Sequence, residues 1–361
     1  MRGARSIRRL AVTAVSLLPV AITVAGCGDK SYQDKQPPPA RITVDGSSTV
    51  LPITQAVARS YAELTPTIID AVASGTGGGF KKLCAGKVAI VGASRPILPA
   101  EIKVCDQHGV KYVEMPIAFD GIAVVVHSSN TWATSMTTAE LKRLWEPASE
   151  GRLLRWSDLR PGWPGEAIAL FGPGVDSGTF DYFTKAIVGE EKASRGDFQA
   201  SEDDDVLVAG VASNRNALGY FGFAYYRKNQ DRLRLVAIDD GDPGNGAGAI
   251  VPSADAIIRG TYHPLSRPLF LYVSQSAARY AQTQHFINYY LDHVAAAAEQ
   301  VGSVPLPPRL LALSRRRFAQ RQHGSAFQRG GIEIGLTVGE LLDAETATVV
   351  AEPAGKPAPA P

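Results

Sequence analysis

The chain has few of the side chains on which metal sites depend. Its 361 residues include only three cysteines and six histidines, and it contains no Cys-x-x-Cys and no His-Glu-x-x-His motif. Zinc sites usually show such spacings. His285 and His293 are eight positions apart, but no acidic partner accompanies them. We therefore expect neither a metal site nor a cofactor.

The chain also lacks an excess of charge of one sign. Once the four arginines of residues 1–27 are set aside, 33 basic and 35 acidic residues remain. Binding a nucleic acid requires a broad basic surface, which this balance does not supply. We interpret the one basic cluster, Arg315 to Arg317, as the solvent-exposed face of a helix.

The apolar run at the N-terminus, residues 10–24, is too short to span a membrane. It contains 15 residues, whereas a spanning helix needs about 20. A basic start and a run of this length are typical of a secretory signal. The following Val24-Ala25-Gly26-Cys27 resembles a bacterial lipobox, which implies cleavage before Cys27 and lipid attachment to its sulfur. We expect a signal peptide over 1–27, a proline-rich tether over 28–40, and a lipoprotein anchored to a membrane in the periplasm or at the cell surface.

Two cysteines remain when Cys27 is assigned to lipid. Cys84 and Cys105 form an even pair, as expected in an oxidising compartment. They could form a disulfide or remain as two free buried thiols. We expect the disulfide after export.

Glycine and hydroxyl side chains gather in four segments, each between a strand-like and a helix-like run. Glycine lets the backbone approach a ligand closely, and hydroxyls donate hydrogen bonds without adding charge. Unpaired N–H groups at a helix N-terminus favour an anion. Together the segments predict one oxyanion site built from several loops. They are residues 45–49, 74–79, 93–96 and 172–179.

Strand-like and helix-like runs alternate along the chain, which predicts an α/β fold with a mostly parallel sheet. Ligands of such sheets bind beyond the carboxyl ends of the strands. The acidic run 202–205 precedes an apolar helix-like run, so we assign it to a helix N-terminus rather than to a calcium site.

Two crossings of the chain would divide it into lobe I (41–127 and 250–342) and lobe II (128–249), followed by a disordered tail (343–361). The first lobe's predicted strands are 42–44, 68–72, 88–93, 111–116 and 122–127, and its predicted helices 50–64, 79–85 and 99–108.

Five longer motifs stand out: Asp-Gly-Ser-Ser-Thr-Val at 45–50, Gly-Thr-Gly-Gly-Gly-Phe-Lys-Lys at 75–82, Asp-Ser-Gly-Thr-Phe-Asp-Tyr-Phe at 176–183, Leu-Gly-Tyr-Phe-Gly at 218–222 and Pro-Leu-Ser-Arg-Pro-Leu at 264–269. With them the chain resembles the PstS family, the periplasmic phosphate-binding proteins of ABC transporters. The resemblance runs from about residue 41 to residue 342. It implies a type II periplasmic-binding-protein fold, two α/β lobes joined by a two-crossover hinge. It also implies a monomer that captures inorganic phosphate and delivers it to an ABC permease with its ATPase subunits.

The resemblance also implies a set of phosphate-binding residues. The chain departs from the better-known branch of the family twice, with Arg95 where that branch has an aspartate and Pro173 where it has an arginine. The residues carried over are Ser48, Thr49, Val50, Thr76, Ser177, Gly178 and Thr179, and Ser94 of the third segment is added to the predicted site.

Arg95 and Asp120 complete the predicted site. We expect Arg95 to supply the cation. We expect Asp120, placed just before a strand, to accept the proton of phosphate and so to repel sulfate. In an alternative role Asp120 forms a salt bridge that holds Arg95 in place. Asp45 and Asp176 are the alternative proton acceptors.

Three other functions remain open. The protein could bind another oxyanion such as sulfate or molybdate, or it could be a phosphate-sensing lipoprotein without a transport partner. It could also be a hydrolase with Ser177 as nucleophile, although a Gly-x-Ser-x-Gly elbow would require glycine where the chain has Val175. Capture of phosphate without catalysis agrees best with the residues.

Overall fold

The structure is a computed structural model that describes residues 40–327, 332–337, 339–341 and 343. The predicted signal peptide, Cys27, the tether up to residue 39 and the tail beyond residue 343 lie outside the described residues. No helix among the described residues combines the length and the apolar character that crossing a membrane requires.

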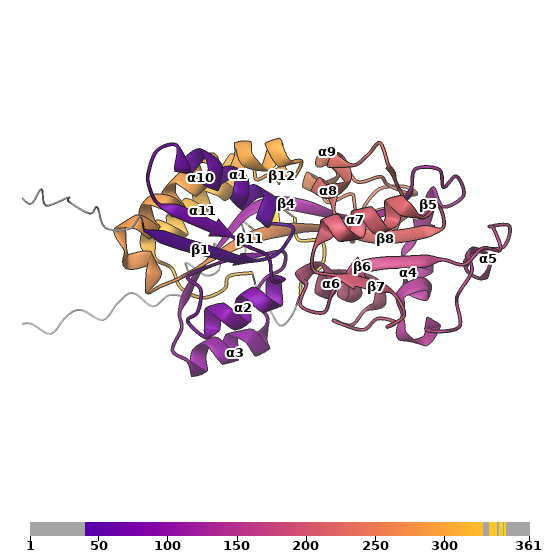
Figure 1. Cartoon of the computed structure of the whole chain (residues 1–361), viewed down its shortest axis with the longest axis horizontal. Coiled ribbons are helices and arrows are strands. Elements are labelled where there is room, and N and C mark those ends of the chain that lie inside the picture. Colours follow the sequence, from indigo (N-terminus) through magenta and orange to yellow (C-terminus); the bar gives the residue numbers. More distant parts are fainter. Residues whose placement is uncertain (1–39, 328–331, 338, 342, 344–361) are drawn as a thin grey trace, which may run out of the picture. The chain divides into compact units, whose positions relative to one another are not determined.

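The helices and strands form two lobes, and β4 (Tyr112–His127) runs through both (Figure 1). The first lobe contains β1 (Arg41–Gly46), α1 (Leu51–Ala62), β2 (Ile68–Ala71), α2 (Thr76–Cys84), β3 (Ile90–Ala93), α3 (Pro99–Gln107), β11 (Ser266–Ser274), η3 (Ala277–Arg279), α10 (Ala281–Val301), β12 (Val304–Pro305) and α11 (Pro308–Gln320). The second contains β5 (Ser135–Thr137), α4 (Thr138–Trp145), η1 (Pro147–Ser149), α5 (Trp156–Leu159), β6 (Ala169–Pro173), α6 (Gly178–Phe183), η2 (Thr184–Val188), β7 (Gln199–Ser201), α7 (Asp204–Ser213), β8 (Ala217–Gly222), α8 (Phe223–Lys228), β9 (Leu233–Leu235), β10 (Ala237–Asp239) and α9 (Ala254–Ile258).

Strand β4 differs from the sequence prediction, which divided it into two strands. Its first part pairs with β11 up to Gly121, and its second part pairs with β8 from Ile122 onward. One uninterrupted strand therefore passes from one lobe into the other. The first of the two predicted strands ended at Pro116, and proline is rare inside strands. Here it lies where the register with β11 shifts, an irregularity that tolerates a residue without an N–H group.

The sheet is mixed, with the order β2-β1-β3-β11-β4-β8-β6-β7. The prediction of a mostly parallel sheet holds for the outer strands of each lobe, where β1 pairs in parallel with β2 and β3, and β6 with β7 and β8. In the centre, β11 and β4 pair antiparallel. The four hydroxyl and glycine segments lie at the carboxyl ends of β1, β2, β3 and β6.

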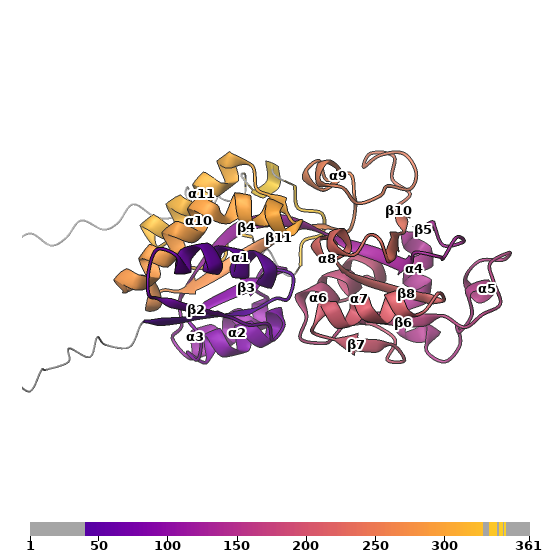
Figure 2. The same cartoon turned by 45° about the horizontal axis from the view of Figure 1, so that its top comes forward.

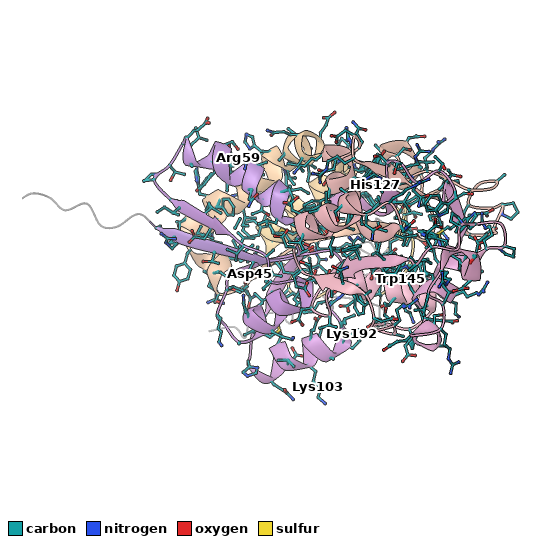
Figure 3. The ribbon with its side chains drawn as sticks, turned by 45° about the vertical axis from the view of Figure 1, so that its right-hand side comes forward. Asp45, Arg59, Lys103, His127, Trp145 and Lys192 are labelled. Atoms are coloured by element: carbon teal, nitrogen blue, oxygen red, sulfur yellow. A yellow bond between two sulfur atoms is a disulfide. The ribbon has the colours of Figure 1, made fainter. Side chains whose placement is uncertain are left out.

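Helices cover the sheet of each lobe and bury its apolar side chains. In the first lobe α1, α10 and α11 lie on one face of the sheet, and α2 and α3 lie on the other (Figures 1 and 2). Figure 3 labels Trp145 in the second lobe. Its ring meets those of Phe183, Phe198 and Tyr220 nearly edge to face. Such aromatic contacts add to the burial of apolar area. Each lobe thus supports its binding loops on a packed layer.

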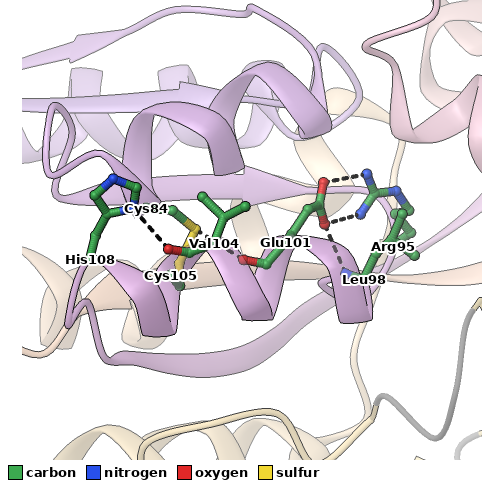
Figure 4. Close-up of a disulfide and its surroundings, with 7 residues drawn as sticks. All are labelled: Cys84, Arg95, Leu98, Glu101, Val104, Cys105 and His108. Carbon is green, nitrogen blue, oxygen red and sulfur yellow. Dashed lines mark hydrogen bonds and ion pairs between the residues drawn. A yellow bond between two sulfur atoms is a disulfide. The ribbon is translucent and has the colours of Figure 1, made fainter.

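The predicted disulfide between Cys84 and Cys105 is confirmed (Figure 4). Cys84 ends α2 and Cys105 lies in α3, so the bond joins the two helices that follow the second and third binding segments. It closes a loop with a sequence separation of 21.

The prediction of a solvent-exposed arginine face on α11 is wrong for Arg317. This side chain is only 1% exposed, and it donates to the main-chain oxygens of Glu114 and Gly324. Arg315, by contrast, is exposed and pairs with Asp292. Arg317 is buried because α11 packs against β4.

Candidate functional site

The binding segments of the two lobes touch each other. The N–H of Gly77 in α2 donates to the main-chain oxygen of Asp176 in the second lobe, at 2.9 Å. Gly75 makes this approach possible, since a Cβ atom there would lie 2.3 Å from the same oxygen, and its φ is +76°. Glycine alone adopts such a conformation readily. The helix starts of both lobes therefore meet at one place.

Arg267 and Asp120 form a buried ion pair at the centre of this region. They are direct cross-strand partners in β11 and β4, and Arg267 Nη2 lies 3.0 Å from Asp120 Oδ2. Both side chains are fully buried. Burial raises the pKa of Asp120, and the guanidinium and the N–H of Phe223 oppose this rise. Cross-strand pairing thus fixes one positive and one negative group beside the binding loops.

Two hydroxyls from opposite lobes lie against the same guanidinium. Arg267 Nη2 is 2.8 Å from Thr179 Oγ1 and 3.3 Å from Thr49 Oγ1. The two hydroxyl oxygens are 3.3 Å apart. Thr49 precedes α1 in the first lobe, and Thr179 lies in the first turn of α6 in the second. The guanidinium therefore joins donors from both lobes.

A second pair of hydroxyls lies next to the start of α6. Thr76 Oγ1 and Ser94 Oγ are 3.2 Å apart. A Cβ atom at Gly178 would lie 2.5 Å and 2.7 Å from these oxygens. Glycine therefore lets the α6 backbone reach them. Ser177 caps α6 by accepting from the N–H of Thr179 at 3.1 Å.

All ten predicted binding residues are buried, and they come from the same region of the structure. At two of these residues, a main-chain group that could contact a ligand is already hydrogen-bonded within the protein. The Val50 N–H donates to the Ser47 main-chain oxygen at 3.2 Å. The Ser48 main-chain oxygen accepts from the Tyr225 hydroxyl of the second lobe at 3.0 Å.

The predicted salt bridge between Asp120 and Arg95 does not form. Arg95 Nε donates to Asp181 at 2.8 Å, and its terminal nitrogens donate to Glu101 (Figure 4). Arg95 is 1% exposed and joins α3 of the first lobe to α6 of the second. The cation beside the hydroxyls is Arg267, which the sequence analysis did not propose as a ligand.

Asp45 and Asp176 hold their own loops. Asp45 accepts from the Gly46 N–H at 2.7 Å and from the Ser74 hydroxyl at 2.9 Å, and it pairs with Lys82. Asp176 pairs with Lys81 at 2.6 Å.

Asp204 is a further carboxylate that the sequence analysis assigned only to a helix N-terminus. The helix start is confirmed, since Asp203 caps α7 through the N–H of Asp205. However, Asp204 is only 1% exposed, and no donor among the described residues reaches its Oδ2. Burial raises the pKa of Asp204 to about 7, and a hydrogen bond with the Ser48 side chain opposes the rise.

The arrangement is suited to holding a small anion. Buried uncharged donors surround one guanidinium, and donors from two lobes meet there. In the part of the chain that the structure describes, no three His, Cys, Asp or Glu side chains gather as metal ligands would. The fold and the site therefore define a two-lobed binding protein for a small anion.

Comparison with known proteins leads to the same class. Residues 33–293 match the family described as the PBP superfamily domain. Protein SphX of Synechocystis sp. is 46% identical over 304 residues, which is 83% of this chain and 88% of that protein. Phosphate-binding protein PstS of Staphylococcus saprophyticus is 33% identical over 291 residues, or 80% of this chain and 87% of that protein. A crystal structure of a possible phosphate binding protein from Planctomyces limnophilus is 40% identical, with a TM-score of 0.59 over 79% of this chain and 99% of that one.

The chain belongs to the PstS family within the PBP superfamily. Its fold is the type II periplasmic-binding-protein fold, as the sequence motifs predicted.

Proposed function

We propose that this protein captures inorganic phosphate between its lobes and delivers it to an ABC permease. The observation that carries this proposal is the buried group of hydroxyls from both lobes around Arg267. A hydrogen bond to a charged group contributes about 1.5–3 kcal/mol. Several such donors in a site closed to water can therefore hold a small oxyanion. The names of the relatives in Staphylococcus and Planctomyces refer to the same ligand.

The proposed ligands differ from the sequence prediction in the cation. Arg267 supplies the cation that the sequence analysis expected from Arg95. The N–H groups of Arg95 instead donate to Glu101 and Asp181. The remaining proposed ligands are Ser48, Thr49, Val50, Thr76, Ser94, Asp120, Ser177, Gly178 and Thr179.

The proposed role requires no catalysis. Ser177 Oγ caps α6 by accepting a hydrogen bond from the Thr179 N–H. This structural role accounts for the residue without a nucleophilic one. The captured phosphate would leave the cleft chemically unchanged.

The proposed location is the outer side of a membrane, where a lipid on Cys27 holds a monomer. The basic and apolar N-terminus and the Val-Ala-Gly-Cys sequence support this proposal. Mass spectrometry of membrane-bound protein tests it. Cys27→Ala should release the protein from the membrane, and an unmodified N-terminus in the wild type would contradict the anchor.

Calorimetric titration of protein stripped of endogenous phosphate tests the binding function. We expect one phosphate per chain, with weaker binding of sulfate and molybdate. No heat and no binding with phosphate would refute the proposal, and tighter binding of sulfate or molybdate would reassign the ligand. Phosphate uptake by cells with and without the gene separates transport from sensing.

A further inference from the structure

A groove on the first lobe gathers positive charge away from the anion site. Its volume is about 830 Å³, within the usual range for small-molecule sites. Lys87, Lys111 and Arg279 line it, and all three side chains are exposed. Among the described residues, no aspartate or glutamate lines the groove. The groove therefore offers positive charge to a partner outside the protein.

Main-chain hydrogen bonds hold the walls of the groove together. The Gln275 N–H donates to the main-chain oxygen of Lys111 at 2.7 Å. The neighbouring Ser274 N–H donates to the main-chain oxygen of Ala89 at 2.8 Å, two residues after Lys87. The segments that carry the two lysines are thus both bonded to the end of β11, and the third cation follows in η3. The cations lie on a fixed frame.

The three cations have no counter-charge within the described part of the chain. None of them makes an ion pair or a side-chain hydrogen bond with another described residue. Other arginines of the first lobe are paired, as Arg41 is with Asp70 and Arg315 with Asp292. Like charges that share a groove repel each other, so binding an anionic group there is favourable.

The chain enters the first lobe at the same end of the sheet. β1 begins at Arg41, and in its parallel pairing with β3 Val44 lies opposite Ile90. Arg41 and Lys87 each precede these partners by three residues, so both lie where the two strands begin. The binding segments lie at the opposite, carboxyl ends of the strands. The groove is therefore on the side of the lobe that the N-terminal tether reaches first.

The length of the tether limits how far this end can move from the proposed lipid anchor. Residues 28–40 number 13, and a chain of this length spans at most about 45 Å. With a lipid on Cys27, the end of the lobe that carries the groove stays within this distance of the membrane. Lipid headgroups are then the anionic groups at the highest local concentration.

We propose that the groove of Lys87, Lys111 and Arg279 binds the phosphate groups of anionic lipids and so seats the first lobe on the membrane. The inference rests on the proposed lipid anchor and goes beyond phosphate capture. Tyr280 also lines the groove and is 61% exposed, and tyrosine is enriched at the level of lipid headgroups. Because the groove belongs to the first lobe alone, the second lobe remains free to move.

The expected strength follows from the number of cations. Each lysine or arginine near an anionic membrane surface contributes about fivefold to the binding equilibrium. Three such groups contribute about a hundredfold, which is too little to hold a free protein on a membrane. It is sufficient to orient a protein that a lipid already anchors.

Energy transfer from a dye on the protein to dyes in the bilayer tests the proposal. The donor dye is placed on Gln282→Cys, an exposed position in the first turn of α10 two residues after Tyr280. The lipidated full chain is inserted into vesicles of phosphatidylcholine alone, or of phosphatidylcholine mixed equally with phosphatidylglycerol. We expect greater transfer on the anionic vesicles, and we expect the difference to shrink as salt screens the exposed charges.

A triple variant removes the cations of the groove by Lys87→Gln, Lys111→Gln and Arg279→Gln. It should lower the ratio of seated to unseated protein about a hundredfold on anionic vesicles. Its energy transfer should then equal that on phosphatidylcholine. Phosphate affinity in calorimetry should remain that of the wild type, since the groove lies away from the anion site, and this result shows that the variant is folded.

A matched control removes three exposed cations of the second lobe, which also lack an ion pair with any described residue. It changes the net charge by the same amount, so it separates the groove from a general loss of positive charge. The control should retain the wild-type difference between the two kinds of vesicle. Its substitutions are Lys142→Gln, Arg232→Gln and Arg234→Gln.

Three results would overturn the proposal. One is equal transfer on the two kinds of vesicle, and another is a difference that persists in the groove variant. The third is a second inorganic phosphate ion bound per chain and lost in the groove variant, which would assign the groove to a free anion. Protein that does not float with either kind of vesicle would refute the lipid anchor on which the proposal rests. Absence of phosphate binding by anchored and seated protein would instead refute the proposed capture function alone.

Discussion

Replacing Arg267 should separate the stability of the fold from the binding of the anion. Arg267→Met keeps a long apolar side chain but leaves Asp120 buried without its cation. Removing one partner of a buried ion pair costs about 3–5 kcal/mol of unfolding free energy. Arg267→Met combined with Asp120→Asn removes both charges, and the amide oxygen can still accept from the Phe223 N–H. We therefore expect the double variant to regain most of the lost stability.

Phosphate binding should follow the opposite pattern. Arg267 Nη2 lies against both Thr49 and Thr179, so it is placed to contact an anion held by these hydroxyls. Loss of two charge-assisted hydrogen bonds corresponds to about 3–6 kcal/mol. The affinity should therefore fall by roughly two to four powers of ten. It should remain low in the double variant, because the second substitution restores no donor.

Urea unfolding and calorimetric titration with phosphate measure the two effects. The matched control is the exposed pair of Arg315 and Asp292, whose nitrogen and oxygen are also 3.0 Å apart. Arg315→Met and Arg315→Met with Asp292→Asn should each change stability by less than about 1 kcal/mol and leave phosphate binding intact. Wild-type affinity in Arg267→Met, or a double variant no more stable than the single one, would refute the reasoning.

Two further predictions concern the loops and their support. Gly178→Ala should weaken phosphate binding at least tenfold in calorimetry, because the new methyl group would lie 2.5 Å from Thr76 Oγ1 and 2.7 Å from Ser94 Oγ; Gly165→Ala, where no atom lies within 4 Å, is the control for added bulk, and unchanged affinity in Gly178→Ala would contradict the close approach. Reduction of the Cys84–Cys105 disulfide, which closes a loop with a separation of 21, should lower the unfolding free energy by about 3 kcal/mol in urea titrations with and without reductant; an unchanged midpoint would count against this contribution.

The binding loops could be predicted from the sequence because their signals are local. A glycine or a hydroxyl next to the first turn of a helix has the same meaning in any fold. Gly75, Thr76 and Ser177 accordingly lie at helix starts in the structure. The α/β class could be predicted for the same reason, since it depends on the alternation of short patterns.

The charged groups of the site could not be placed from local patterns. Arg267 meets Asp120 only because β11 and β4 pair in one particular register. One indication was available, since an arginine two positions before the apolar run Leu269–Val273 is expected to be buried and to need an acidic partner. Asp204 gave less indication, because its burial depends on the packing of α7 against β6 and β8.

The continuous strand β4 has a consequence for the rate of ligand capture. Separation of the lobes must bend β4 between Gly121 and Ile122, where its pairing changes from β11 to β8. Asp120 and Arg267 lie within the first lobe's ladder beside this point, so they stay paired while Thr179 moves away from Thr49. The open protein therefore meets an incoming anion with its positive group already in position. Because the ion pair carries no net charge, it offers oriented N–H groups rather than long-range attraction, and the association rate constant should change little as ionic strength rises.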